Sequence, residues 1–195
     1  MKLLVVVDYQ NDFVDGVLGF SKAKALENRL AEKIEKHIQE GGKVLFTMDT
    51  HMEDYLETRE GKVLPTPHCI QGTSGWDLHG KVKELFDKHV LNNSNETPCY
   101  MIFKDSFGMD IGLHFGAMLI KRIIKSCDEI EICGVVTNMC VISVAVSLQS
   151  IAVNTPITID ASLCASFNDE LHEKALDVME GLQMNVINRE VAKHD

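Results

Sequence analysis

The sequence predicts an α/β fold with three layers, in which helices cover both faces of a mainly parallel sheet of about six strands. Short apolar runs, typical of buried strands, alternate along the chain with longer segments of helical periodicity. A strand that is apolar throughout needs cover on both faces, so this alternation favours a parallel sheet between two helical layers. The chain has 195 residues and an ordinary 45% hydrophobic content. We therefore expect residues 1–195 to form a single domain.

The first half of the chain predicts two strands, two helices and a long loop. Strands are expected at 3–7 and 43–48. A helix is expected at 23–39, because four apolar side chains recur along one face: Leu26, Leu30, Ile34 and Ile38. The polar stretch 50–73 is too long for a simple connection, which makes it a candidate functional loop. A short helix is expected at 76–86.

The second half repeats a strand–helix unit. It predicts strands at 99–103, 130–136, 157–159 and 184–187, and helices at 111–125, 141–150 and 169–181. We find no internal repeat, linker or low-complexity segment in the sequence.

Charge and composition exclude several classes of partner. The formal net charge of −10 disfavours a nucleic-acid or anionic-membrane surface, and no apolar stretch approaches the ~20 residues of a membrane span. Six cysteines occur without a secretory signal or a Cys-x-x-Cys pair, which favours free thiols in a cytoplasmic protein. We expect a small-molecule substrate, no nucleic-acid or membrane partner, and assembly as a homo-oligomer.

Four reactive side chains follow the ends of predicted strands. Asp8 follows 3–7, Asp49 follows 43–48, Lys104 follows 99–103, and Cys140 lies just past 130–136. Ligands and chemistry gather at the carboxyl ends of the strands in an open parallel sheet, so we expect the four to converge on one site. Cys140 also precedes a helical run, whose unpaired N–H groups would favour the thiolate.

Each of these residues also has a purely structural interpretation. An isolated Cys140 would most often be a small buried hydrophobe, Asp8 a turn or helix-cap residue, and Lys104 an exposed edge residue. Their shared position at strand ends favours the alternative, in which Cys140 is a nucleophile, Asp8 its base and Lys104 their counter-charge.

A second group of residues has the composition of a metal site. Asp49 and His51 are separated by a single residue, and His68 in the long loop could complete a three-ligand face. Glu60, in the same loop, is a candidate fourth ligand. Spacing alone leaves open that these are unrelated polar loop residues. Phe13 would by default be a core aromatic.

Five segments together resemble the isochorismatase-like cysteine hydrolases, and within them the nicotinamidase branch. The segments are 8–13 (DYQNDF), 49–51 (DTH), 67–75 (PHCIQGTSG), 103–104 (FK) and 134–140 (GVVTNMC). The resemblance implies a catalytic triad of Asp8, Lys104 and Cys140, with an oxyanion hole formed by the amides of Val136 and Cys140. It also implies a cis peptide bond between Val135 and Val136.

The resemblance further implies that Phe13 lines the pocket against a flat ring, and that Asp49, His51 and His68 bind a divalent metal. Zinc is the first expectation, with iron or manganese as alternatives. The implied reaction is hydrolysis of a small carboxamide through a thioester, with nicotinamide to nicotinate and ammonia as the leading example.

Two departures from the nicotinamidase pattern keep other substrates open. Residues 14–17 (VDGV) stand where nicotinamidases usually carry a Gly-Gly pair, and residues 52–55 (MEDY) replace a His-Pro segment and a second histidine. One alternative is an isochorismatase-type or ureido-compound hydrolase with the same triad, although such relatives generally lack the metal ligands. The other is a non-catalytic metal- or ligand-binding oligomer in which Cys140 is a redox-sensing thiol.

Overall fold

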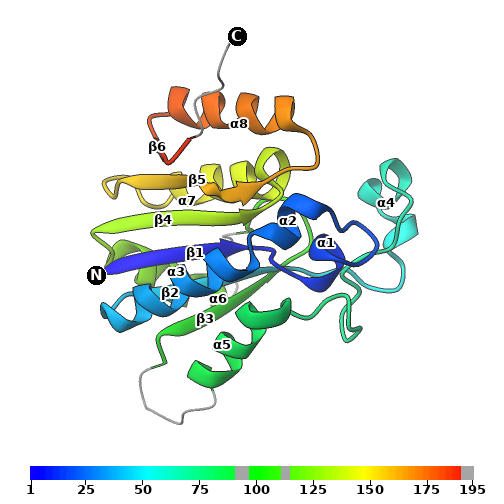
Figure 1. Cartoon of the computed structure of the whole chain (residues 1–195), viewed down its shortest axis with the longest axis horizontal. Helices are drawn as coiled ribbons and strands as arrows, with labels where there is room; N and C mark the ends of the chain where they lie inside the picture. The colour runs from blue at the N-terminus through cyan, green and yellow to red at the C-terminus, as the bar shows by residue number, and fades with distance from the viewer. Residues whose placement is uncertain (91–96, 111–114, 190–195) are drawn as a thin grey trace.

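The computed structural model describes residues 1–90, 97–110 and 115–189. A six-stranded sheet runs through the middle of the described chain, and every pair of neighbouring strands is parallel (Figure 1). The strands lie in the order β3-β2-β1-β4-β5-β6. Their bounds are β1 (Lys2–Val7), β2 (Lys43–Asp49), β3 (Cys99–Lys104), β4 (Glu129–Val135), β5 (Ile157–Ala165) and β6 (Asn185–Ile187). The predicted fold class is confirmed.

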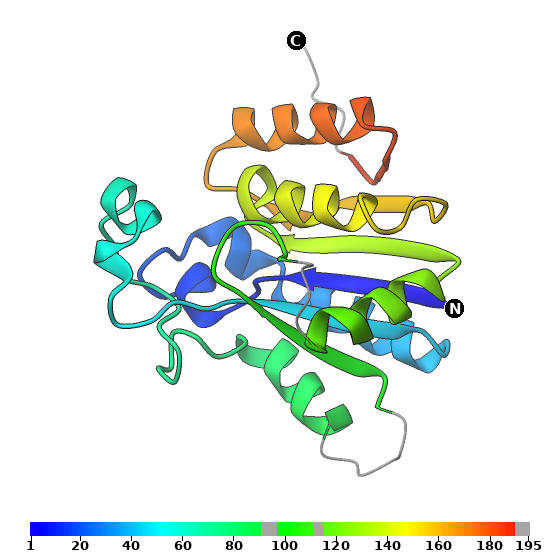
Figure 2. The ribbon, with the colours of Figure 1, turned by 180° about the vertical axis from the view of Figure 1, so that it is seen from behind.

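Helices cover both faces of this sheet. The helices are α1 (Asn11–Val14), α2 (Ser21–Ala25), α3 (Glu27–Gln39), α4 (Arg59–Val63), α5 (Gly80–Val90), α6 (Phe115–Lys125), α7 (Ile142–Gln149) and α8 (Asp169–Gly181), with short turns η1 (Tyr55–Glu57) and η2 (Thr137–Val141). Figure 1 shows α3 and α5 on one face, and the reverse view in Figure 2 shows α6 and α7 on the other. Within the described ranges, no helix has both the length and the apolar character needed to cross a membrane.

Alternating side chains of the strands divide the core into two parts. On β1, Leu3 and Val5 belong to the core under α6, α7 and α8, whereas Leu4 and Val6 belong to the core under α2, α3 and α5. All four side chains are fully buried. The central strands are therefore apolar on both faces, which is the pattern that predicted the layers.

Several predicted elements differ from the observed ones at their ends. The helix predicted at 23–39 is two helices, α2 and α3, which meet at Leu26. The apolar stripe continues across this break, so periodicity does not reveal it. The helix predicted at 76–86 begins later, at Gly80, whose φ of +44° lies in the left-handed region. The last strand but one extends well beyond 157–159, to Ala165.

The remaining differences are small. The helix predicted at 111–125 is α6, and residues 111–114 of that prediction lie outside the described residues. The long loop at 50–73 holds η1 and α4, and α4 stands beyond the carboxyl ends of the strands (Figure 1). The loop therefore lies over the edge of the sheet where the sequence placed the site.

Candidate active site and metal centre

The four residues predicted at strand ends converge on one point. Lys104 Nζ lies 2.6 Å from Asp8 Oδ2, 3.2 Å from Asp49 Oδ1 and 3.5 Å from Cys140 Sγ. Each of the four residues is at most 4% exposed. Neighbouring parallel strands β3, β2, β1 and β4 deliver them to the same edge, as the strand-end pattern predicts.

Asp8 is held in an uncommon backbone conformation. It follows β1 with a φ of +46°, in the left-handed region that few non-glycine residues adopt. The hydroxyl of Thr47 on β2 donates a hydrogen bond of 2.6 Å to Asp8 Oδ1, while Oδ2 faces Lys104. Burial raises the pKa of Asp8 above its ordinary value, and the charge of Lys104 opposes that rise. A carboxylate in this setting can accept a proton readily.

Lys104 is the cation shared by the other three groups. Burial lowers the pKa of Lys104, but the negative charges of Asp8, Cys140 and Asp49 outweigh that effect and raise the pKa well above its ordinary value. Its ammonium also donates a hydrogen bond to the Ser106 carbonyl at 3.1 Å. Lys104 therefore stays protonated and holds the two carboxylates beside the thiol.

Cys140 lies in the π-helical turn η2, and not at the start of α7. The carbonyl of Val136 accepts hydrogen bonds from the amides of Met139 and Val141, which closes the turn around the cysteine. Burial raises the pKa of the Cys140 thiol well above its ordinary value, and Asp8 adds to the rise by its charge and by accepting the thiol hydrogen. The expectation of a favoured resting thiolate is therefore wrong. The thiol needs a base, and Asp8 is in contact with it.

A glycine permits the close crossing that precedes this turn. Gly134 has a φ of +118°, and a Cβ atom added there would lie 2.2 Å from the carbonyl oxygen of Val7. The peptide bond between Val135 and Val136 is cis, as the resemblance implies. Val136 and Cys140 thus belong to one tight turn, and their joint role as an oxyanion hole stays a prediction.

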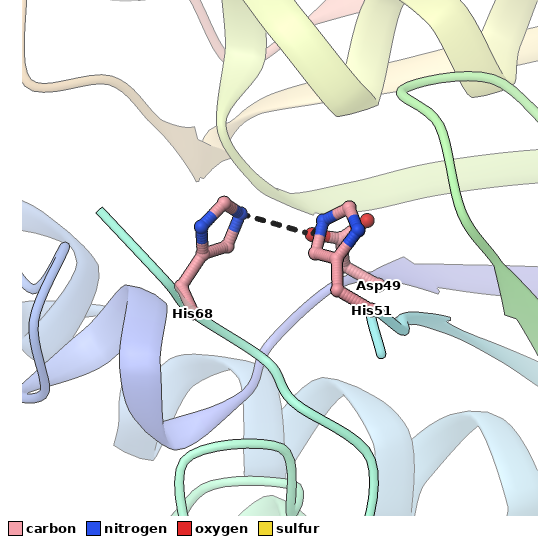
Figure 3. Close-up of side chains that lie close together, drawn as sticks. All are labelled: Asp49, His51 and His68. Carbon is pink, nitrogen blue, oxygen red and sulfur yellow. Dashed lines mark hydrogen bonds and ion pairs between the residues drawn. The ribbon is translucent and has the colours of Figure 1, made fainter. Parts of the chain in front are cut away.

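Asp49, His51 and His68 form a compact cluster of metal-binding side chains. Asp49 Oδ2 lies 3.1 Å from His51 Nε2 and 3.3 Å from His68 Nε2, and Figure 3 shows both imidazole rings beside the carboxylate. One donor atom from each residue falls within 4.8 Å of the others. The structure therefore brings together the three residues that the sequence singled out.

The donor set of this cluster fits a divalent transition metal. His68 Nδ1 donates to the Thr66 carbonyl at 2.9 Å, and this bond turns Nε2 toward Asp49. Burial raises the pKa of Asp49, but hydrogen bonds from His51 and His68 and the charge of Lys104 outweigh that effect. The pKa of Asp49 is therefore lower than its ordinary value, and the carboxylate is ionised. Two imidazole nitrogens and one carboxylate oxygen suit zinc, iron or manganese.

Glu60 lies at the border of this cluster. Its Oε1 atom is 3.9 Å from His51 Nε2 and 3.8 Å from His68 Nε2. It comes from α4, beyond the ends of the strands. Glu60 is therefore a neighbour of both histidines, outside the compact group of three.

Two further residues, which were not predicted from the sequence as part of the site, hold the cluster in place. Gln10 clamps the backbone of Asp49, since Gln10 Nε2 donates to its carbonyl at 2.9 Å and Gln10 Oε1 accepts from its amide at 2.8 Å. Asp12 Oδ2 accepts from the amide of Cys69, next to His68, at 2.7 Å. Both lie in the segment 8–13 on which the resemblance rests, so that motif carried a signal for them.

One cavity of about 640 Å³ joins the two groups. Cys140 and Val136 line it together with Asp49 and His68. The ring of Phe13 also lines it and packs edge-on against His68, with 5.4 Å between ring centroids. Its volume lies in the range of small-molecule sites. A flat ring in this cavity could contact Phe13 while its substituent reaches Cys140.

Comparisons with known proteins agree with this geometry. Residues 2–191 match the model of the isochorismatase domain. The "uncharacterized isochorismatase family protein PncA" of Bacillus subtilis is 32% identical, over 90% of this chain and 92% of its own. The pyrazinamidase/nicotinamidase structure from Streptococcus mutans is 29% identical with a TM-score of 0.81, covering 96% and 100% of the two chains. The zinc complex of Pyrococcus horikoshii pyrazinamidase is 21% identical with a TM-score of 0.72, covering 96% and 99%. The chain belongs to the isochorismatase family.

Proposed function

We propose that this protein hydrolyses small aromatic carboxamides, converting nicotinamide to nicotinate and ammonia through a thioester on Cys140. The observation that carries the proposal is the buried contact of Lys104 with Asp8 and Cys140, next to a cavity that Cys140, Asp49 and His68 all line. The family and the pyrazinamidase/nicotinamidase of Streptococcus mutans, to which the chain is similar, support the same reaction.

The first half of the reaction forms the thioester. Asp8 accepts the thiol proton as the sulfur of Cys140 attacks the carboxamide carbon, which activates an otherwise protonated nucleophile. The amides of Val136 and Cys140 donate hydrogen bonds to the developing oxyanion, each worth about 3–4 kcal/mol. Protonated Asp8 then gives its proton to the leaving nitrogen, and ammonia departs as the C–N bond breaks.

The second half restores the enzyme. Asp8, again a carboxylate, takes a proton from water as the water oxygen attacks the thioester carbon. The C–S bond breaks, the acid is released, and the proton returns to the sulfur of Cys140. Lys104 remains charged throughout, so negative charge on Asp8 or on the sulfur of Cys140 lies 2.6 or 3.5 Å from its ammonium.

Asp49, His51 and His68 are the proposed ligands of a divalent metal, zinc first, with Glu60 as a further ligand. The zinc in the Pyrococcus horikoshii structure supports this assignment. When bound, the metal supplies a Lewis-acid anchor for a ring nitrogen of the substrate, directly or through a water molecule. Phe13 packs against the face of the ring and, with the anchor, sets the distance from the carboxamide to Cys140.

The proposal extends to the setting of the reaction. Residues 1–195 act as one hydrolase domain in a cytoplasmic homo-oligomer, with a small-molecule amide as substrate and no nucleic-acid or membrane partner. The net charge of −10 and the absence of a predicted membrane span in the sequence support the part of this proposal that concerns nucleic-acid and membrane partners.

Ammonia release from a panel of amides tests the function directly. Nicotinamide and pyrazinamide should be hydrolysed, while benzamide, which lacks a ring nitrogen, should react more slowly. Because the proposed metal anchors the ring nitrogen, a chelator should reduce the difference in rate between nicotinamide and benzamide. Cys140→Ala should abolish turnover with unchanged circular dichroism. The matched control is Cys127→Ala, which removes another buried cysteine and should keep full activity. Hydrolysis by the Cys140 variant at the wild-type rate, or no ammonia from any amide, would exclude the proposal.

A further inference from the structure

We propose that His172, on α8, is a positioning residue that fixes the turn carrying the nucleophile by its hydrogen bond to Thr137. The inference rests on the proposed function for its kinetic consequences, and on the structure alone for the contact. His172 Nδ1 lies 2.8 Å from Thr137 Oγ1. Thr137 directly follows Val136, is fully buried, and precedes Cys140 by three residues in η2.

A second contact joins the same two segments. The hydroxyl of Ser166 donates a hydrogen bond of 2.6 Å to Asn138 Oδ1, the side chain next to Thr137. Ser166 Oγ in turn accepts from the amide of Asn168 at 3.0 Å, and Asn168 Oδ1 caps α8 by accepting from the Leu171 amide at 2.9 Å. Two consecutive residues of η2, Thr137 and Asn138, are therefore hydrogen-bonded to the first turn of α8 and to the segment before it.

The turn needs such support for two physical reasons. A π-helical turn is a rare conformation, and local hydrogen bonds maintain it less well than they maintain an α-helix. The Thr137 hydroxyl is also buried, and a buried hydroxyl without a partner is costly. His172 supplies that partner. Loss of this bond would let the Thr137 side chain turn toward another partner, and would thereby shift the turn that carries the amides of Val136 and Cys140.

The His172 ring acts in this contact as a neutral hydrogen-bonding group. Burial lowers the pKa of His172, so the ring is uncharged near neutral pH. His172 is not among the residues that line the cavity. A role through Thr137 therefore predicts an effect on the rate of the chemical steps with little effect on substrate binding.

The test compares four variants in the ammonia assay, with rates expressed per iodoacetamide-reactive Cys140. His172→Leu should lower kcat about 10- to 100-fold, the scale of an approximately 1 Å displacement of catalytic groups, with KM unchanged. Thr137→Val should give a similar loss, and the double variant should be no worse than Thr137→Val alone. His172→Asn should recover most of the rate, because its amide places a polar atom close to the position of Nδ1.

The control removes a comparable histidine elsewhere. His37 on α3 is buried and its Nε2 bonds to the Lys43 carbonyl at 3.1 Å, far along the chain from η2. His37→Leu should lower Tm without lowering kcat. The proposal is overturned if His172→Leu keeps the wild-type kcat, if His172→Asn is as slow as His172→Leu, or if the losses of the double variant multiply.

Hydrogen exchange separates this inference from the proposed function. Amide exchange in residues 137–141 needs no substrate, and His172→Leu should accelerate it while His172→Asn should not. If His172→Leu accelerates exchange but the wild-type protein hydrolyses no amide, the role of His172 in supporting the turn stands and the proposed function is rejected. Unchanged exchange in the leucine variant would reject the contact, whatever the activity.

Discussion

Lys104→Met should destabilise the protein far more than Asp8→Asn, although the two changes remove opposite partners of one ion pair. The asymmetry follows from the contacts of the ammonium. Lys104 Nζ lies 2.6 Å from Asp8 Oδ2 and 3.2 Å from Asp49 Oδ1. Its loss leaves two buried carboxylates without their shared cation. Asp8→Asn, in contrast, leaves Lys104 paired with Asp49.

The magnitudes follow from these contacts. Removing one partner of a buried ion pair costs about 3–5 kcal/mol, because the remaining charge stays buried without compensation. We expect a loss in this range for Lys104→Met. For Asp8→Asn we expect about 1–2 kcal/mol, the scale of an altered buried hydrogen bond, since Thr47 can still donate to the amide oxygen.

The pH dependence of Lys104→Met has a definite sign. Burial already raises the pKa of Asp8, and the loss of the opposing positive charge raises the pKa further. A carboxyl group whose pKa is higher in the folded state keeps its full stability below the unfolded pKa of about 3.9 and loses it as the pH rises through the folded pKa. The destabilisation should therefore grow between about pH 5 and about pH 8.

Urea unfolding followed by circular dichroism measures both effects. Wild type and the two variants are compared at about pH 5 and about pH 8. All three are first dialysed against a chelator, so that Asp49 is free of metal in each. Equal losses in the two variants would refute the shared-cation argument. A Lys104→Met protein that becomes more stable as the pH rises would refute the assignment of the raised pKa to Asp8.

Three further outcomes are expected. Asp8→Asn should lower amide hydrolysis by about 10²- to 10⁴-fold in the ammonia assay, because it removes the base; a smaller loss than tenfold would exclude that role. His51→Ala should yield protein with substoichiometric metal by elemental analysis while iodoacetamide still labels Cys140, and full metal content would contradict the ligand assignment. Gly134→Ala should lower the free energy of unfolding by more than about 1 kcal/mol in a thermal melt, since its Cβ would meet the Val7 carbonyl.

The strands were predictable because each is a local apolar run. β1 and β2 differ from their predicted ranges by one residue at an end, and the reactive residue after each run correctly marked the edge of the sheet. β5 was not predicted at full length, because Asp160 and Ser162 interrupt its apolar pattern. Ser162 satisfies both residues locally, as its amide and hydroxyl donate to Asp160 Oδ1. In the sequence, such a pair of polar residues indicates a turn, although here the two are hydrogen-bonded to each other within one strand.

The placement of the site residues was predictable for the same reason, and the residues that support them were not. Asp8, Lys104 and Cys140 follow strand ends, so topology alone brings them together. Gln10 and His172 act through bonds to residues 39 and 35 positions away. No local periodicity records such a contact. Only the motif around Gln10 gave a signal, and His172 gave none.

The carboxylate of Asp49 connects the metal cluster to the nucleophile. Its Oδ1 atom faces Lys104 at 3.2 Å, while Oδ2 faces the Nε2 atoms of His51 and His68. The contacts from the histidines to Cys140 therefore run through Asp49 and then Lys104, while the charge of Asp49 also acts directly on the thiol and raises its pKa. Because Lys104 also has the shorter contact with Asp8, at 2.6 Å, the ammonium keeps its place when Asp49 is perturbed. This geometry explains why removal of a histidine should weaken substrate anchoring while the thiol remains open to alkylation.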